Sequence, residues 1–91
     1  MSASETRHVK LVYFAWVREK VGRSAEDVEL PASAKTIADL VAWLKSRGPE
    51  FEAAFERANV VRAAIDKVHV KFDASILGAR EIAFFPPVTG G

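Results

Sequence analysis

The residues whose type and position most directly suggest chemistry are the last two of the chain, Gly90 and Gly91. Glycine has no Cβ, so the backbone of a partner or a cofactor can approach it closely. An unhindered carboxylate can be adenylated and then attacked by a nucleophile, and we expect the carboxylate of Gly91 to be the most exposed reactive group of the protein. A terminal Gly-Gly alone is weak evidence, because many chains end in small, frayed residues.

The segment before the glycines adds a feature that an inert end does not need. Pro86 and Pro87 hold φ near −65° and favour an extended polyproline conformation. At about 3.3 Å per residue, the segment from Pro86 to Gly91 can reach roughly 20 Å. Residues 86–91 are therefore predicted to form an extended reactive tail, in which Thr89 and Gly90 thread into the site of a partner.

Phe84 and Phe85 are adjacent in a predicted strand, so their side chains point to opposite faces. One of them enters the core, and the other needs a cover. A neighbouring loop is the usual cover, but here the outward ring continues into further apolar tail residues, which favours a partner interface. The predicted partner-binding residues are Phe84, Phe85, Pro86, Pro87 and Val88.

Other kinds of chemistry find little support. The chain contains no cysteine, which excludes disulfides, thiolate zinc sites and cysteine nucleophiles. If this protein handles sulfur, it cannot hold that sulfur on a side-chain thiol. His8 and His69 are the two histidines, and neither stands at a metal-ligand spacing or in a catalytic arrangement, so no metal site is predicted.

Length and charge narrow the class of protein. The chain has 91 residues, room for a single domain. Its 13 basic and 12 acidic residues are interspersed, so no nucleic-acid footprint is visible. No apolar stretch approaches membrane-spanning length, and residues 1–8 lack the features of a signal peptide. We expect a cytoplasmic protein with no nucleic-acid or membrane partner, and a flexible extension over residues 1–7.

The elements that must position the tail follow from hydrophobic spacing. Ile37, Leu40, Val41 and Leu44 share one helical face, and Thr36 is the predicted N-cap, with Asp39 three residues later. The remaining expected elements are a strand over 9–16, a turn or helical loop over 17–22, an edge strand over 25–30, a helix over 50–58, strands over 62–65 and 68–72 joined by a tight turn at 66–67, a loop over 73–80 with one helical turn near 75–77, and a last strand over 81–85.

This order, two strands, a helix and further strands, is typical of the β-grasp or ubiquitin-like class. That class is an α+β fold in which one main helix packs on one face of a mixed sheet. The predicted domain spans residues 8–85.

The residues Glu81 to Gly91 resemble the C-terminal signature of the molybdopterin synthase small subunit, the sulfur carriers of the MoaD/ThiS family. Val9 to Gly22, with Phe14-Ala15 and then Val17-Arg18-Glu19, resembles the first strand and following loop of that family. The resemblance covers nearly the whole chain from His8 onward. Two departures, Arg80 where an acidic residue is common and Asp66 where Asn is frequent, lie outside the tail.

The resemblance implies a role for each part of the tail. An E1-like adenylyltransferase would use ATP to form an acyl-adenylate on Gly91, and a sulfur donor would convert it to a thiocarboxylate. The tail would then insert into the large subunit of a heterotetrameric synthase and give sulfur to cyclic pyranopterin monophosphate, in molybdenum cofactor biosynthesis. The chain would bind no cofactor and would not be an enzyme alone, in keeping with its lack of a Gly-rich phosphate loop.

Three alternatives remain open. The first is a sulfur carrier for thiazole synthesis or tRNA thiolation, which would share the terminal Gly-Gly. The second is a ubiquitin-like modifier that joins lysines through Gly91, and the third is an interaction domain with an inert tail. The Phe-Phe-Pro-Pro segment favours the molybdopterin synthase role.

Overall fold

The computed structural model describes residues 6–87. The last four tail residues and residues 1–5 of the predicted extension lie outside this range. In chain order the elements are β1 (Thr6–Tyr13), α1 (Ala15–Val21), β2 (Ala25–Pro31), α2 (Ile37–Lys45), α3 (Pro49–Ala54), η2 (Ala58–Val60), β3 (Arg62–Ile65), β4 (Val68–Val70) and β5 (Glu81–Phe85).

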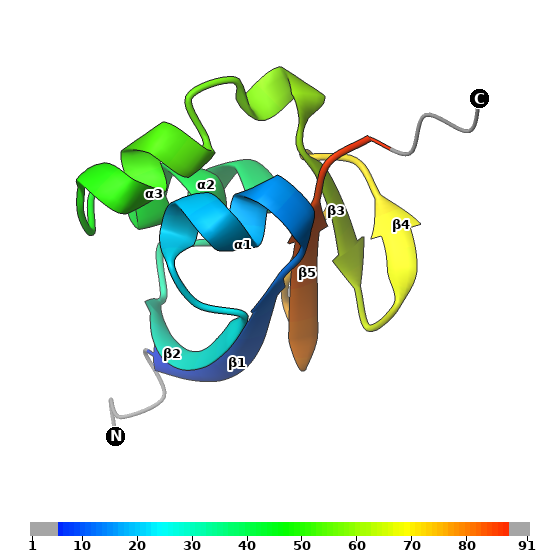
Figure 1. Ribbon diagram of the computed structural model, residues 1–91. Coiled ribbons are helices and arrows are strands. Elements are labelled where there is room, and N and C mark those ends of the chain that lie inside the picture. The colour runs from blue at the N-terminus through cyan, green and yellow to red at the C-terminus, as the bar shows by residue number, and fades with distance from the viewer. Residues whose placement is uncertain (1–5, 88–91) are drawn as a thin grey trace.

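The five strands form one mixed sheet in the order β2-β1-β5-β3-β4. The last strand, β5, is the central one: it runs parallel to β1 and antiparallel to β3. All three α-helices lie on one face of the sheet (Figure 1). This is the α+β arrangement that the predicted β-grasp class requires. Within the described residues, no helix combines the length and apolar character needed to cross a membrane.

The core lies between the sheet and the helices. Alternate residues of two neighbouring strands point into it, Val9, Leu11 and Tyr13 from β1 and Ile82 and Phe84 from β5. They pack in one cluster with buried residues of the helix layer, among them Val17, Ile37, Leu40, Leu44, Phe51 and Phe55. Because the apolar residues of these strands alternate, the opposite face of the sheet carries a separate set of side chains.

The start of α2 confirms the predicted cap. The Thr36 hydroxyl accepts from the Asp39 backbone N–H at 3.1 Å, and the Asp39 carboxylate accepts from the Thr36 N–H at 3.2 Å. This reciprocal pair is a complete capping box. The predicted turn at Asp66-Lys67 is also present, and both residues have positive φ, 48° and 73°, as a tight hairpin of this kind requires.

The N-terminal part of the fold differs from the prediction at two boundaries. The first strand ends at Tyr13, and α1 begins at Ala15, whose φ of 54° breaks the extended backbone. The strand also begins earlier than expected, because Thr6 and Arg7 pair with Pro31 and Leu30 of β2. Residues 6 and 7 therefore belong to the sheet and not to a flexible extension.

Three later boundaries are also corrected. The helix after Pro49 ends at Ala54 and is followed by the separate short turn η2. The strand β4 ends at Val70, two residues earlier than predicted. No helical turn forms near residues 75–77, because Ser75 makes an isolated β-bridge to Thr36.

Candidate functional site

The candidate site is the C-terminal end of β5, where the chain leaves the sheet towards the tail. This strand is paired on both sides, with Lys10–Tyr13 of β1 and with Arg62–Ile65 of β3. Beyond the last pair with β1, the Phe14 N–H donates to the Phe84 carbonyl at 3.1 Å. The tail therefore leaves from the central strand of the sheet. Hydrogen bonds to β1 on one side and to β3 on the other fix the position of this exit.

The inward side chain at this exit is Phe84, which is fully buried. Its ring stacks on Tyr13 with centroids 6.3 Å apart and meets Phe55 edge-on at 5.0 Å. Aromatic pairs in these geometries add about 0.5–1.5 kcal/mol each beyond the burial of area. Phe84 is consequently a core residue that anchors the strand, which corrects its place among the predicted partner-binding residues.

The outward side chain is Phe85, which is half-buried on the face opposite the helices. Its ring lies against His69 of β4, with centroids 5.0 Å apart, and Arg62 of β3 is its partner in register. Pro86 and Pro87 are also half-buried. These three predicted docking residues lie together at the exit and keep part of their surface accessible.

The reactive end of the site lies beyond the described residues. Val88, Thr89, Gly90 and Gly91, which carry the predicted docking, threading and carboxylate roles, are outside residues 6–87. The structure therefore presents the platform from which the tail starts and the residues that surround its first two prolines.

Phe14 is a neighbour of the exit that sequence analysis did not assign to the site. It follows Tyr13, which pairs with Phe84, and its side chain is 47% exposed. The sequence predicts an uninterrupted strand over residues 9–16, which would place Phe14 within the strand and not just beyond its end. The Phe-Ala pair at this point was visible in the sequence, but only the parallel pairing of β1 with β5 brings it to the tail.

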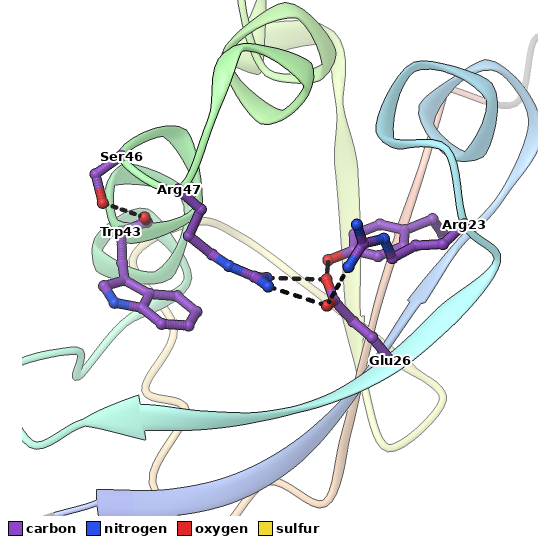
Figure 2. A network of polar contacts seen from close by, with 6 residues as sticks. Arg23, Glu26, Trp43, Ser46 and Arg47 are labelled. Carbon is purple, nitrogen blue, oxygen red and sulfur yellow. Dashed lines mark hydrogen bonds and ion pairs between the residues drawn. The ribbon is translucent and has the colours of Figure 1, made fainter.

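A polar network centred on Glu26 lies beside the aromatic core, and Figure 2 shows the side chains of Arg23 and Arg47 pointing towards its carboxylate. The Tyr13 hydroxyl donates to Glu26 of β2 at 2.7 Å. The same carboxylate accepts from Arg47 at 3.0 and 3.2 Å and from Arg23 at 3.0 Å. The Arg47 guanidinium also lies over the Phe51 ring, 4.6 Å from its centroid. The network therefore joins β1 and β2 to the turn between α2 and α3.

The pKa values of this network reflect its burial and its charges. Burial, and then donation of its hydroxyl proton to Glu26, raises the pKa of Tyr13, so the phenol stays protonated. For Glu26, burial opposes ionisation, but the hydrogen bonds from Arg47 and Tyr13 and the two positive charges outweigh it and lower its pKa. The carboxylate is therefore ionised at neutral pH, as a structural clamp requires.

Metal chemistry finds no support at this exit. Over residues 6–87, no group of three or more histidine, cysteine, aspartate or glutamate side chains is arranged to hold a metal ion. The groups that surround the exit are aromatic rings, prolines, the imidazole of His69 and the cation of Arg62, which suit contact with another protein.

Comparison with known proteins identifies relatives along nearly the whole chain. The ThiS family model matches residues 11–91. The chain is 36% identical over 83 residues to the molybdopterin synthase sulfur carrier subunit of Escherichia coli strain K12, covering 91% of this chain and 99% of that protein. It is 31% identical over 90 residues to the protein of the same name from Mycosarcoma maydis, covering 94% and 96%.

The fold is shared with solved structures. The crystal structure of SAMP1 from Haloferax volcanii matches with a TM-score of 0.71 at 20% identity, covering 93% of this chain and 100% of that chain. At this identity the similarity concerns the fold alone. It confirms the ubiquitin-like β-grasp class predicted from the order of the elements.

Proposed function

This chain belongs to the ThiS family, and we propose that it is the sulfur-carrier subunit of a molybdopterin synthase. The coarser role of sulfur carrier follows from the family and from the names of its relatives. The finer proposal is that sulfur is carried as a thiocarboxylate on Gly91 and is delivered to cyclic pyranopterin monophosphate in the large subunit.

The observation that supports this proposal most directly is the position of β5. The strand is paired on both sides and its last inward residue, Phe84, is locked in the core. The strand passes directly into Pro86 and Pro87, whose fixed φ favours continued extension. A rigid central strand followed by two prolines can aim a short tail into the site of another protein at little entropic cost.

The proposed chemistry takes place on the terminal carboxylate. One carboxylate oxygen of Gly91 attacks the α-phosphorus of ATP on an E1-like activating enzyme, and pyrophosphate leaves. A hydrosulfide ion then attacks the acyl carbon of this adenylate, the bond to the phosphate oxygen breaks and AMP leaves, and loss of the thiol proton gives the thiocarboxylate. This chain contributes the acyl group and its presentation, whereas nucleotide binding and catalysis belong to the partners.

The decisive experiment measures the intact mass of the chain after co-expression with an E1-like activator and a sulfur source. We expect a species in which one oxygen is exchanged for sulfur. The matched control carries one alanine after Gly91. The terminal carboxylate is then displaced by one residue and is flanked by the methyl side chain of alanine. This variant should fold normally, stay unmodified and fail to support molybdopterin formation.

The other outcomes separate the alternatives. Covalent adducts of this chain on other proteins would support the modifier role. A wild-type mass that never changes would favour an interaction domain with an inert tail. Full molybdopterin formation by the extended variant would contradict the terminal-carboxylate mechanism.

A further inference from the structure

A hollow beside the exit of β5 is not used by the tail chemistry. It has a volume of about 490 Å³ and lies where β3 begins and β4 ends. Its apolar lining comes from Val61, which is buried, and from Val70 and Phe72, which are half-buried. Its polar groups are Asn59 and two exposed cations, Arg62 and Lys71. We call this feature the cationic hollow.

The sign of its charge distinguishes the cationic hollow from others on the molecule. The hollow between α1 and α3 is lined by Lys20 and Arg57 together with Glu56, so both signs are present. No carboxylate lines the cationic hollow. Within residues 6–87, neither Arg62 nor Lys71 forms an ion pair, although Asp73 is close in the chain.

The Arg62 side chain is oriented rather than free to turn. Its Nη1 donates to the Asn59 carbonyl at 3.2 Å, which keeps the guanidinium at the rim of the cationic hollow. One such bond leaves most of the five donors of a guanidinium available. The remaining donors suit a carboxylate, which a guanidinium binds in a planar, bidentate manner.

The cationic hollow lies within reach of any protein that takes the tail. Arg62 is the register partner of Phe85, the last residue of β5. A protein that receives the residues after Pro87 must approach this end of the sheet. Covering Arg62 and Lys71 with an apolar surface would remove water from two charges without compensation, which is strongly unfavourable.

From this arrangement we propose that the cationic hollow receives an acidic side chain, next to an apolar one, from the protein that accepts the tail. The apolar side chain packs on Val70 and Phe72, and the carboxylate pairs with Arg62 and Lys71. The inference rests on the proposed function, since it takes the large subunit of molybdopterin synthase as that protein. Two cations around an apolar floor fit such a segment better than a nucleic acid, which needs a longer track of positive charge.

The test compares two double variants that change the net charge equally. Arg62→Glu/Lys71→Glu reverses the cationic hollow, whereas Arg18→Glu/Lys45→Glu reverses one arginine of α1 and one lysine of α2, neither of which lines the cationic hollow. Binding of each to the purified large subunit is measured by stopped-flow kinetics at low and high salt. Thermal unfolding of both variants checks that the fold is retained.

We expect the hollow variant to associate about tenfold more slowly or worse than the control variant at low salt. The association rate of the wild type should fall as salt rises, and the hollow variant should lose this dependence. The milder Arg62→Ala/Lys71→Ala variant should fall between the wild type and the reversal, because it removes the attraction without adding repulsion.

Three results would overturn the inference. Equal association rates for the two reversal variants would show that the large subunit does not bind the cationic hollow. The proposed function would not be affected by this result. Wild-type self-association in sedimentation that the hollow reversal abolishes would assign the hollow to a second copy of this chain. Failure of the wild type to bind the large subunit at all would contradict the proposed function and the inference together.

Discussion

The two adjacent phenylalanines at the end of β5 have different roles, because their side chains point to opposite faces of the sheet. Phe84 is fully buried against Tyr13 and Phe55, whereas Phe85 is half-buried on the open face against His69. The sequence predicts this division, because neighbours in a strand point to opposite faces. It does not say which phenylalanine enters the core, since that depends on the register of β5 with β1 and β3.

The pair offers a matched test of stability against docking. Phe84→Ala removes a core ring and should lower the free energy of unfolding by about 3–5 kcal/mol. Phe85→Ala loses a contact with one imidazole and should lower it by about 1 kcal/mol. Denaturant unfolding measures both values.

For binding to the partner, we expect Phe85 to be the residue that matters, although it contributes less to stability than Phe84. Phe85→Ala is expected to weaken binding to the large subunit although the variant remains fully folded at the temperature of the measurement, because its loss of stability is small. Isothermal titration of the folded variant measures this loss. Unchanged affinity would show that Phe85 is covered by the protein's own surface contacts and has no part in docking.

At the scale of elements, the turn between β3 and β4 sets the start of β5. The Asp66 carboxylate accepts from the backbone N–H groups of Arg80 and Glu81, at 3.1 and 2.9 Å. The Asp66 N–H donates to the Glu81 carbonyl at 2.8 Å. Arg80 and Asp66, the two departures from the family pattern, therefore meet at one point of the structure.

This geometry predicts different effects for two substitutions at the turn. Asp66→Ala removes the acceptor of two N–H groups and places a residue without a polar side chain at a φ of 48°. It should cost about 1–2 kcal/mol of stability. Asp66→Asn keeps a carbonyl acceptor and tolerates positive φ, so its effect should be a small fraction of that value.

Urea unfolding and hydrogen exchange of the Arg80 and Glu81 amides measure these effects. Faster exchange at both amides is expected for the alanine variant alone. Wild-type stability and exchange in the alanine variant would show that the Asp66 side chain does not hold the start of β5.

Most elements are predictable from spacing, and the differences have local physical causes. The apolar stripe and capping box of α2 and the alternation of β5 are strong signals, and both elements form as expected. The boundary after Tyr13 depends on a positive φ at Ala15. Alanine rarely adopts positive φ, so the sequence does not indicate that the strand ends there. The cationic hollow was also beyond the sequence, because Arg62 and Lys71 come together only when β3 pairs with β4.

At the scale of the whole molecule, one carboxylate joins the sheet to the helix layer. Glu26 lies on β2 with its side chain 11% exposed, and binds Tyr13 of β1 and Arg47 after α2. Partly buried charge pairs of this kind contribute stability only while both partners are charged. The two layers that hold the tail platform are therefore coupled through a group that titrates.

The sign of the pH dependence follows from the lowered pKa of Glu26. In the unfolded chain the pKa of Glu26 is the ordinary one of a glutamate side chain. Because the folded pKa lies below this value, the stabilisation is fully present above the unfolded pKa and is lost as pH falls through the folded one. At pH 7, Glu26→Gln should therefore lower the free energy of unfolding by about 1.5–3 kcal/mol, the range for hydrogen bonds to charged groups.

The difference between the wild type and Glu26→Gln should then shrink as the pH falls from the ordinary pKa of glutamate through the lowered pKa of Glu26 in the folded state, because the wild-type carboxyl becomes protonated over this range. Chemical denaturation at pH 7 and at pH 3 measures it. Glu19→Gln, which removes an exposed carboxylate from α1, is the control and should change stability little at either pH. A difference for Glu26→Gln that is the same at both pH values would contradict the charge-dependent coupling and would point to a purely steric role for this side chain between the layers.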